Sequence, residues 1–309
     1  PAAAATVRTT TATAPPQPLG AAGLSYPGIP PVSSFNSSAT LYGLRTSADD
    51  RTNVAVYNPT TEPVAVRVTA FAGDGTGFSV VKADSLEIPG LGWTQLSGIL
   101  DGTGITNGWV TIENTGGSGS FGAYGVINDN RTSDGSFVFP VGGTLQGASL
   151  TVPVLVETTA GFTSELVLTN RASVSARLTL SYVESLTSSL GTGGTHSLDL
   201  APRTQLIIPD AIDYLRGKGV KIGARGAASF AGTLRVSVAG TTLSNVFAGA
   251  RTAARCPVGG QFGLFTPGIY SGQEASAESY VYGLRADALN RTNVAVLNAG
   301  ADGGGAVTL

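Results

Sequence analysis

A seventeen-residue stretch occurs twice in this chain, and this repetition limits the folds available to it. "YGLRTSADDRTNVAVYN" occupies residues 42–58 and "YGLRADALNRTNVAVLN" occupies residues 282–298, with twelve of the seventeen positions identical. The offset is 240 residues (282 − 42), and the same offset relates further matches upstream: Gly23-Leu24 to Gly263-Leu264, and Pro27-Gly28-Ile29 to Pro267-Gly268-Ile269. A constant offset indicates one structural unit that begins again.

Between the two copies the sequence alternates between apolar and polar residues. In "PVAVRVTAF", Val64, Val66 and Val68 fall on one face of an extended chain, and Arg67 and Thr69 fall on the other. Further short segments of this kind follow, separated by turns rich in Gly and Asp such as "GDGTG", "DGTGITNG" and "GGSGS". Short strands at intervals of about ten residues predict an all-β fold of antiparallel β-sandwich domains.

A second unit repeats this pattern with less identity. "LTVPVLVE", "SELVLTN" and "SARLTLSYV" match the first three strands of the first unit, and "SFAGTLRVSV" resembles "SFGAYGVI". One short helix is expected in "PDAIDYLRGKG", because Asp210 suits the N-cap, Ile212 and Leu215 share a face, and Gly217 suits the C-terminal cap. We therefore predict tandem antiparallel β-sandwiches at residues 23–142 and 143–258.

The two ends of the chain raise a further question. Residues 1–22 are rich in Ala, Thr and Pro, which is typical of an extended tail or linker, although "TVRTTTAT" has the β-branched content of a strand. Residues 259–309 look like the start of a third sandwich, with Val307 and Leu309 where the first unit has Val66 and Val68. A few strands cannot close a sandwich, and their apolar faces and open edge would favour aggregation.

Two explanations for the incomplete third unit stay open at this stage. Either the chain continues past Leu309 in a longer array, or strands from another copy complete the unit by donor-strand complementation, with the N-terminal tail as donor. Contacts of the second kind are heterologous, and they propagate into fibres when they do not close into rings. The candidate residues for a head-to-tail interface are Val7, Thr9, Thr11, Tyr282, Leu284, Val294, Val296, Val307 and Leu309.

The composition argues against several functional classes. Charged residues make up 12% of the chain and the net charge is −2, so there is no basic excess to bind a nucleic-acid backbone. Cys256 and His196 are the only residues of their kinds, which leaves no internal disulfide, no multi-histidine metal centre and one candidate base for a nucleophilic triad. No apolar run approaches the roughly 18–20 residues that span a membrane. We expect neither an enzyme nor a cofactor.

Acidic residues in the predicted turns deserve a separate interpretation. Asp129 and Asp134 lie in "NDNRTSDG", where Asp and Asn commonly bond nearby backbone amides. Oxygen ligands gathered in a loop can also bind calcium, so these two residues are weak calcium candidates. Arg45 and Arg285 are expected at the ends of hairpins, where an arginine can bond loop carbonyls or nearby acids.

The segments "RTNVAVYNPTTEPVAVRVTAF" and "GWVTIENTGGSGSFGAYGVINDNRTSDGSFVFP" resemble the tandem Ig-like β-sandwich repeats of large secreted or cell-surface bacterial proteins. The resemblance covers residues 36–142 and 259–309 well and 145–255 loosely. It implies a secreted or cell-surface location and a repeat-built architecture. The charge-poor composition and the apolar, incomplete third unit favour a structural role, as a subunit of a filament or stalk. The alternative is an adhesin or a carbohydrate- or partner-binding module of a larger secreted protein. Expected partners are further copies, joined head to tail, and a surface glycan or the cell envelope.

Overall fold

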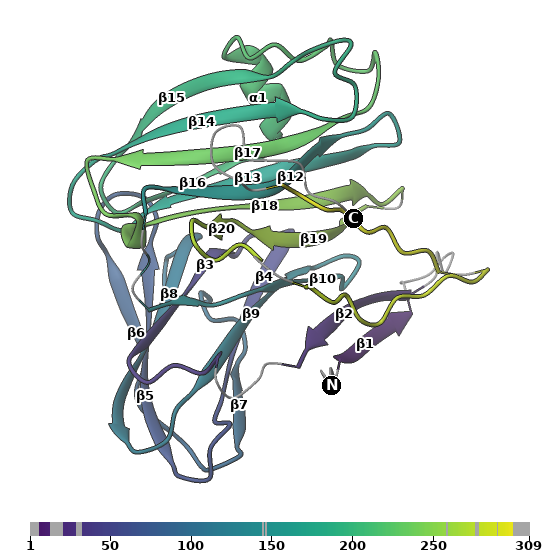
Figure 1. The fold of residues 1–309 in the computed structure, drawn as a ribbon. Helices are drawn as coiled ribbons and strands as arrows, with labels where there is room; N and C mark the ends of the chain where they lie inside the picture. Colours follow the sequence, from purple (N-terminus) through teal and green to yellow (C-terminus); the bar gives the residue numbers. More distant parts are fainter. Residues whose placement is uncertain are drawn as a thin grey trace.

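The protein is an all-β molecule built from several antiparallel sheets (Figure 1). The structure, a computed structural model, describes residues 6–12, 21–28, 33–143, 145, 147–257, 259–275, 278–288 and 290–298. Two groups of strands make up most of this part, and we call them the first unit (residues 33–143) and the second unit (residues 147–270). A separate hairpin precedes them.

The first unit consists of two sheets that enclose a shared core. Its sheets have the strand orders β11-β3-β8-β5-β6 and β10-β9-β4-β7. Residues from both sheets, such as Val66 and Ile127, are fully buried in one apolar cluster, which is consistent with a β-sandwich. The strands are β3 (Ser38–Arg45), β4 (Asp50–Tyr57), β5 (Val64–Ala72), β6 (Ser79–Ile88), β7 (Trp93–Leu96), β8 (Asn107–Gly117), β9 (Gly122–Asp129), β10 (Gly135–Val138) and β11 (Val141–Gly142).

The second unit has the same pattern of neighbours. Its strands pair in the orders β20-β12-β17-β14-β15 and β16-β13-β18-β19, and a single pairing of Glu157 with Thr163 joins the two groups into one sheet. Counterparts in the two units therefore differ by nine in strand number. The elements are β12 (Ser149–Glu157), β13 (Phe162–Asn170), β14 (Ala176–Glu184), β15 (Gly194–Leu200), β16 (Thr204–Ile208), α1 (Ala211–Gly217), β17 (Phe230–Ala239), a 3-10 turn (Leu243–Asn245), β18 (Val246–Arg255), β19 (Gln261–Pro267) and β20 (Ile269–Tyr270).

Several sequence predictions are confirmed. Val64, Val66 and Val68 are buried and Arg67 is exposed, as the alternation predicts, whereas Thr69, on the same face as Arg67, is buried. The helix α1 forms where expected: the side chain of Asp210 accepts a hydrogen bond from the backbone N–H of Asp213. The C-terminal cap is Lys218 rather than Gly217, and the left-handed residue that follows is Gly219, with φ of 87°.

One correspondence between the units is wrong. "SFAGTLRVSV" forms β17, which lies between β12 and β14, as β8 lies between β3 and β5. It is therefore the counterpart of β8, and not of "SFGAYGVI", which forms β9. Similar residues misled the comparison because both strands need small and aliphatic side chains on their buried faces.

The ends of the units also differ from the predicted boundaries. The sequence pattern assigns residues 259–309 to a third unit, but β19 pairs with β18 and β20 pairs with β12, which places residues 261–270 in the second unit. It predicts an extended tail, a linker or a donor strand over residues 1–22, and here β1 (Thr6–Ala12) and β2 (Ala21–Pro27) form an antiparallel hairpin. The sequence repeat thus restarts at β19, which still belongs to the second unit.

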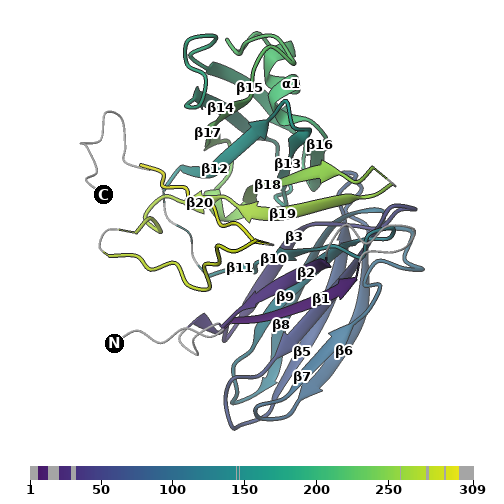
Figure 2. The same cartoon turned by 90° about the vertical axis from the view of Figure 1, so that its right-hand side faces the viewer.

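The two units pack directly against each other. Val167, Phe247 and Phe265 of the second unit belong to the apolar cluster of the first. The ring of Phe247 stacks on that of Tyr42, with their centroids 4.6 Å apart. Figures 1 and 2 show β19 and β10 side by side where the units meet, with β2 on the other side of β10.

Candidate functional site

In the second copy of the repeat, the described residues 282–288 and 290–298 lie largely open to solvent. Leu44 in β3 is 0% exposed, whereas its counterpart Leu284 is 52% exposed. The same contrast separates Tyr42 from Tyr282, Val54 from Val294 and Val56 from Val296, the first of each pair being buried and the second exposed. Identical side chains thus line a core in one copy and an uncovered apolar face in the other.

The exposed copy nevertheless keeps the local geometry of the buried one. The Thr52 hydroxyl donates to the carbonyl oxygen of Arg45 at 2.6 Å and accepts from the Arg45 N–H at 3.2 Å. Thr292 makes the same two bonds with Arg285, at 2.8 and 3.0 Å. The turn at the start of this hairpin is therefore set by its own sequence, while strand pairing needs partners that residues 290–297 do not have among the described residues.

The remaining interface candidates are three residues of β1 and two residues near the end of the sequence. Val7 and Thr9 are exposed on β1, and Thr11 belongs to the same strand. Val307 and Leu309 lie outside the described residues. Exposed apolar side chains therefore occur at both described ends of the molecule, on β1 and on residues 281–296.

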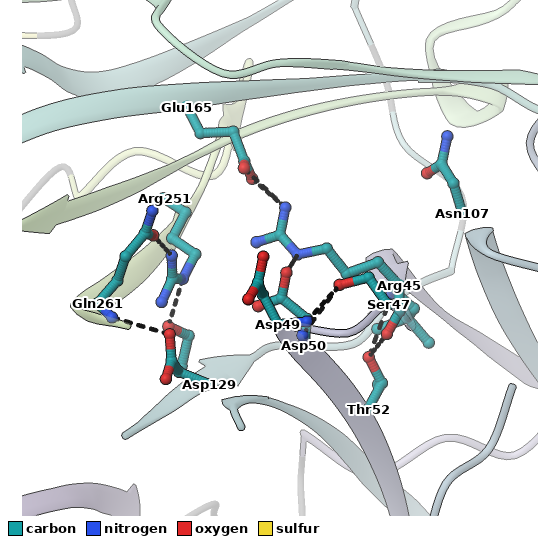
Figure 3. Close-up of polar contacts among 12 residues, drawn as sticks. Arg45, Ser47, Asp49, Asp50, Thr52, Asn107, Asp129, Glu165, Arg251 and Gln261 are labelled. Carbon is teal, nitrogen blue, oxygen red and sulfur yellow. Dashed lines mark hydrogen bonds and ion pairs between the residues drawn. The ribbon is translucent and has the colours of Figure 1, made fainter. Parts of the chain in front are cut away.

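Charged side chains are buried where the two units meet (Figure 3). Nη1 of Arg45, from β3, donates to both carboxylate oxygens of Glu165, from β13, at 2.7 Å. Nε of Arg45 lies 3.4 Å from Oδ2 of Asp50. The prediction that Arg45 meets a nearby acid is confirmed, and because its carboxylate partner Glu165 belongs to the other unit, the pair fixes the units relative to each other.

A buried amide pair adds to this junction. Gln205 of β16 accepts the Gly43 N–H at 2.9 Å through its Oε1, and its Nε2 donates to Oδ1 of Asn107 at 2.6 Å. The Asn107 side chain in turn donates to the Gln205 carbonyl at 2.8 Å. These bonds satisfy polar groups that burial would otherwise penalise, and they hold one register between the units.

The two calcium candidates also lie at the junction. Asp129 accepts hydrogen bonds from the backbone N–H groups of Arg131, Thr132 and Gln261, at 2.8–2.9 Å. Asp134 accepts from the Gly263 N–H at 2.7 Å. In the part of the chain that the structure describes, no group of three or more His, Cys, Asp or Glu side chains could hold a metal ion. Both carboxylates act here as acceptors that tie the first unit to β19, and calcium binding stays a prediction.

Burial changes the ionisation of this cluster. Burial raises the pKa of the Asp134 carboxyl, although the amides of Gly263 and Gly23 and the nearby Arg251 guanidinium oppose the change. Burial lowers the pKa of Arg251, and the positive charge of Arg45 lowers it further. The Arg251 guanidinium bonds to the Ser136 hydroxyl at 3.0 Å and to Oε1 of Gln261 at 2.7 Å.

A hollow of about 650 Å³ opens beside the junction, lined among others by Glu157, Glu165 and Asp210. Each of these acids faces an arginine: Glu157 bonds to Arg216 at 2.7 Å, Glu165 to Arg45 at 2.7 Å and Asp210 to Arg225 at 2.9 Å. Acid–base chemistry by a pair of carboxylates needs one acid whose proton is free to transfer. In this hollow each of the three carboxylates is held in an ion pair with an arginine.

Sequence reasoning missed most of the junction residues. Glu165, Gln205 and Arg251 gave little signal, because each lies in a strand where a polar side chain is expected to face solvent. The one available sign was Arg251 among the small residues of "AGARTAAR", since an arginine between alanines can lie against a close neighbour. Which strand face meets another unit depends on packing between units, which alternation does not encode.

Among the described residues, the structure contains no helix long and apolar enough to cross a membrane. Comparison with protein-family models, with curated proteins and with solved structures found no match.

Proposed function

We propose that this chain is an extracellular structural protein, a subunit of a filament or stalk built from tandem Ig-like β-sandwich units and joined head to tail by strand complementation. The observation that carries the proposal is the contrast between the two copies of the repeat: Tyr282, Leu284, Val294 and Val296 are exposed, whereas the residues at the equivalent positions of the first unit are buried. An uncovered apolar sheet face favours association.

The matching strand orders of the two units support the repeat-built part of the proposal. Ion pairs and hydrogen bonds between amide side chains join the units, which suits a rigid array rather than domains on a flexible linker. The resemblance to repeats of large secreted and cell-surface bacterial proteins supports the location.

The proposal is tested by the size of the full chain in solution as its concentration increases. We expect particles that lengthen with concentration in light scattering, and we expect Leu284→Asp to abolish this growth. Phe78→Asp is the matched control, since Phe78 is also an exposed apolar residue but lies on the first unit, away from the C-terminal segment. A chain that stays monomeric at all concentrations, or growth that Leu284→Asp leaves unchanged, would overturn the proposal.

A second candidate function is carbohydrate binding, which an aromatic group on the first unit favours. Trp93 of β7 is exposed, lies opposite Tyr57 of β4, and donates from its indole N–H to the Tyr124 hydroxyl at 3.0 Å. The ring of Tyr26 packs edge-on against Tyr124, with centroids 5.3 Å apart. Aromatic rings with polar tips at a surface suit the apolar faces and hydroxyl groups of sugars.

Tryptophan fluorescence tests this second candidate. The chain has two tryptophans, and Trp109 is buried, so a saturable change on titration with soluble oligosaccharides would report Trp93. Such a change that is lost in Trp93→Phe would support sugar binding. No change with any oligosaccharide, together with no retention on insoluble polysaccharide, would exclude it.

A further inference from the structure

Where the units meet, β10 lies between β2 and β19 (Figure 2). On one side of β10, Leu24 of β2 forms an apolar cluster with Val126 and Phe137 of the first unit. A Cβ built on Gly135 would lie 3.5 Å from Cβ of Leu24, so the two strands are close enough that a side chain at Gly135 would touch β2.

The other side of β10 meets β19 in the same way. The Ser136 hydroxyl donates to the Gly263 carbonyl at 3.3 Å, and Asp134 accepts the Gly263 N–H at 2.7 Å. Asp134 also accepts the N–H of Gly23, in β2. One strand of the first unit is therefore held between β2 on one side and β19 on the other.

Pairing registers show that the three strands are equivalent. Phe137 lies opposite Val126, and Phe265 lies opposite Arg251. Val126 of β9 lies opposite Asn53 of β4, and Arg251 of β18 lies opposite Glu165 of β13. Asn53 and Glu165 hold the same position in their strands, so Phe137 of β10 corresponds to Phe265 of β19.

The strand β2 matches β19 in the same way. Leu24 and Leu264 both follow a glycine, and each lies opposite a threonine: Thr9 and Thr252. Three positions in the three strands thus correspond: Leu24 with Ser136 and Leu264, Gly23 with Gly135 and Gly263, and Ser25 with Phe137 and Phe265.

The same contact therefore occurs twice in succession. Leu24 contacts the strand at Gly135, and the equivalent Ser136 contacts the next strand at Gly263. The third member of the series is Leu264, and it is 64% exposed. Leu24 and Ser136 are both buried by the next strand in the series, whereas Leu264 of β19 has no strand of this chain against it among the described residues.

A second uncovered position lies on residues 290–297. In the first unit β4 pairs with β9, and in the second unit β13 pairs with β18. The equivalent strand in the N-terminal hairpin is β1, because it pairs with β2 as β18 pairs with β19. Val7 of β1 then corresponds to Ala250, which is buried, yet Val7 is 65% exposed.

We propose that the β1–β2 hairpin of a second copy occupies both uncovered positions: its β2 lies on β19 at Leu264, and its β1 pairs antiparallel with residues 290–297. Carrying the register of β4 and β9 over by the offset of 240 places Val7 opposite Val294 and Arg8 opposite Asn293. Gly23 of the second copy lies against Leu264, as Gly135 lies against Leu24. This placement rests on the proposed head-to-tail assembly and names its contact.

Cysteine cross-linking tests the placement. Mixing chains with Val7→Cys and chains with Val294→Cys should give a disulfide-linked dimer on mild oxidation, because directly opposed strand residues have Cβ atoms about 4.5–5.5 Å apart. The pair Arg8→Cys and Asn293→Cys repeats the test one residue along, since adjacent pairs alternate between closer and wider spacing. The native Cys256 is buried, and the unsubstituted chain controls for it.

The matched control is Val7→Cys mixed with Val296→Cys. Val296 is exposed like Val294 and faces the same way, but it lies two residues, or about 7 Å, along the strand. We expect at least tenfold less dimer with this pair. Equal cross-linking of both pairs would overturn the register.

The arms of the experiment separate this inference from the proposed function. Assembly in light scattering without the Val7–Val294 dimer would leave the filament in place and overturn the hairpin as its contact. If the chain neither assembles nor cross-links, both the proposed function and the placement of the hairpin are overturned. A chain carrying both substitutions that forms only an internal disulfide would show that the hairpin closes on its own chain, which also contradicts the placement in a second copy.

Discussion

Residues 42–56 and 282–296 have nearly the same sequence and opposite surroundings. The first copy forms β3 and β4, with its apolar side chains in the core, whereas the second keeps the hairpin corner and leaves the same side chains exposed. Local sequence therefore sets the turn, through the hydroxyls of Thr52 and Thr292. Burial depends on the other strands of the unit. Matched substitutions at equivalent positions can test this division.

The largest difference is expected at the apolar positions. Leu44→Ala should lower the free energy of unfolding by about 2–5 kcal/mol, because it leaves a cavity in the core. Leu284→Ala should change it by less than about 0.5 kcal/mol in dilute protein, since the Leu284 side chain is 52% exposed and little apolar burial is lost. Urea denaturation measures both. Equal losses would mean that residues 281–296 are packed in solution.

Arginine at the hairpin end gives the next comparison. Arg45→Ala should cost about 1–3 kcal/mol, because it leaves the partly buried carboxylate of Glu165 without its charged partner. Arg285→Ala removes the equivalent exposed arginine and should have almost no effect. Glu165→Ala in the Arg45→Ala background should recover part of the loss, as a double-mutant cycle would show. If the double variant simply adds the two losses, the pair does not hold the units together.

A smaller difference is expected at the threonines. Thr52→Val leaves the Arg45 N–H and carbonyl without a hydroxyl partner in a buried place, at a cost of about 1–2 kcal/mol. Thr292→Val should cost less than about 0.5 kcal/mol, because water can replace the hydroxyl at an exposed corner. Thermal unfolding of the two variants decides. A large effect at Thr292 would contradict the view that this corner is formed but uncovered.

The smallest effect concerns pH at the junction between the units. Because burial raises the pKa of Asp134 in the folded protein, its contribution to stability is present at pH values below the unfolded pKa of 3.8 and is lost as pH rises through the higher folded value. The stability of the parent relative to Asp134→Asn should therefore fall as pH increases from about 3 to 6. Denaturation midpoints of the two chains across this range test the sign. A stability difference that increases with pH would contradict the prediction.

Much of the fold follows from the sequence for a simple reason. Period-two alternation, as at Val64, Val66 and Val68, reports which side of a strand is buried, and the Asp210 cap marks the one expected helix. These signals are local. The presence of strands, and which of their side chains are buried, could be predicted for that reason. The short turns between strands indicated that the strands pair antiparallel.

The boundaries and the junction could not be obtained in this way. The repeat of Gly23-Leu24 as Gly263-Leu264 marks where the sequence restarts, yet β19 completes the sheets of the second unit through pairing with β18. Likewise, nothing near Glu165 or Gln205 indicates that another unit will cover them. Such residues are recognised only when segments more than a hundred positions apart are brought together, as Arg45 and Glu165 are.

Electron cryo-microscopy of the purified native material at high concentration tests the central claim most directly. The proposed assembly predicts a continuous filament in which residues 290–297 of each subunit have become a strand paired with β1 of the next, with Leu264 covered by β2. Isolated particles in which residues 281–296 and Leu264 remain exposed at the highest concentration would contradict it.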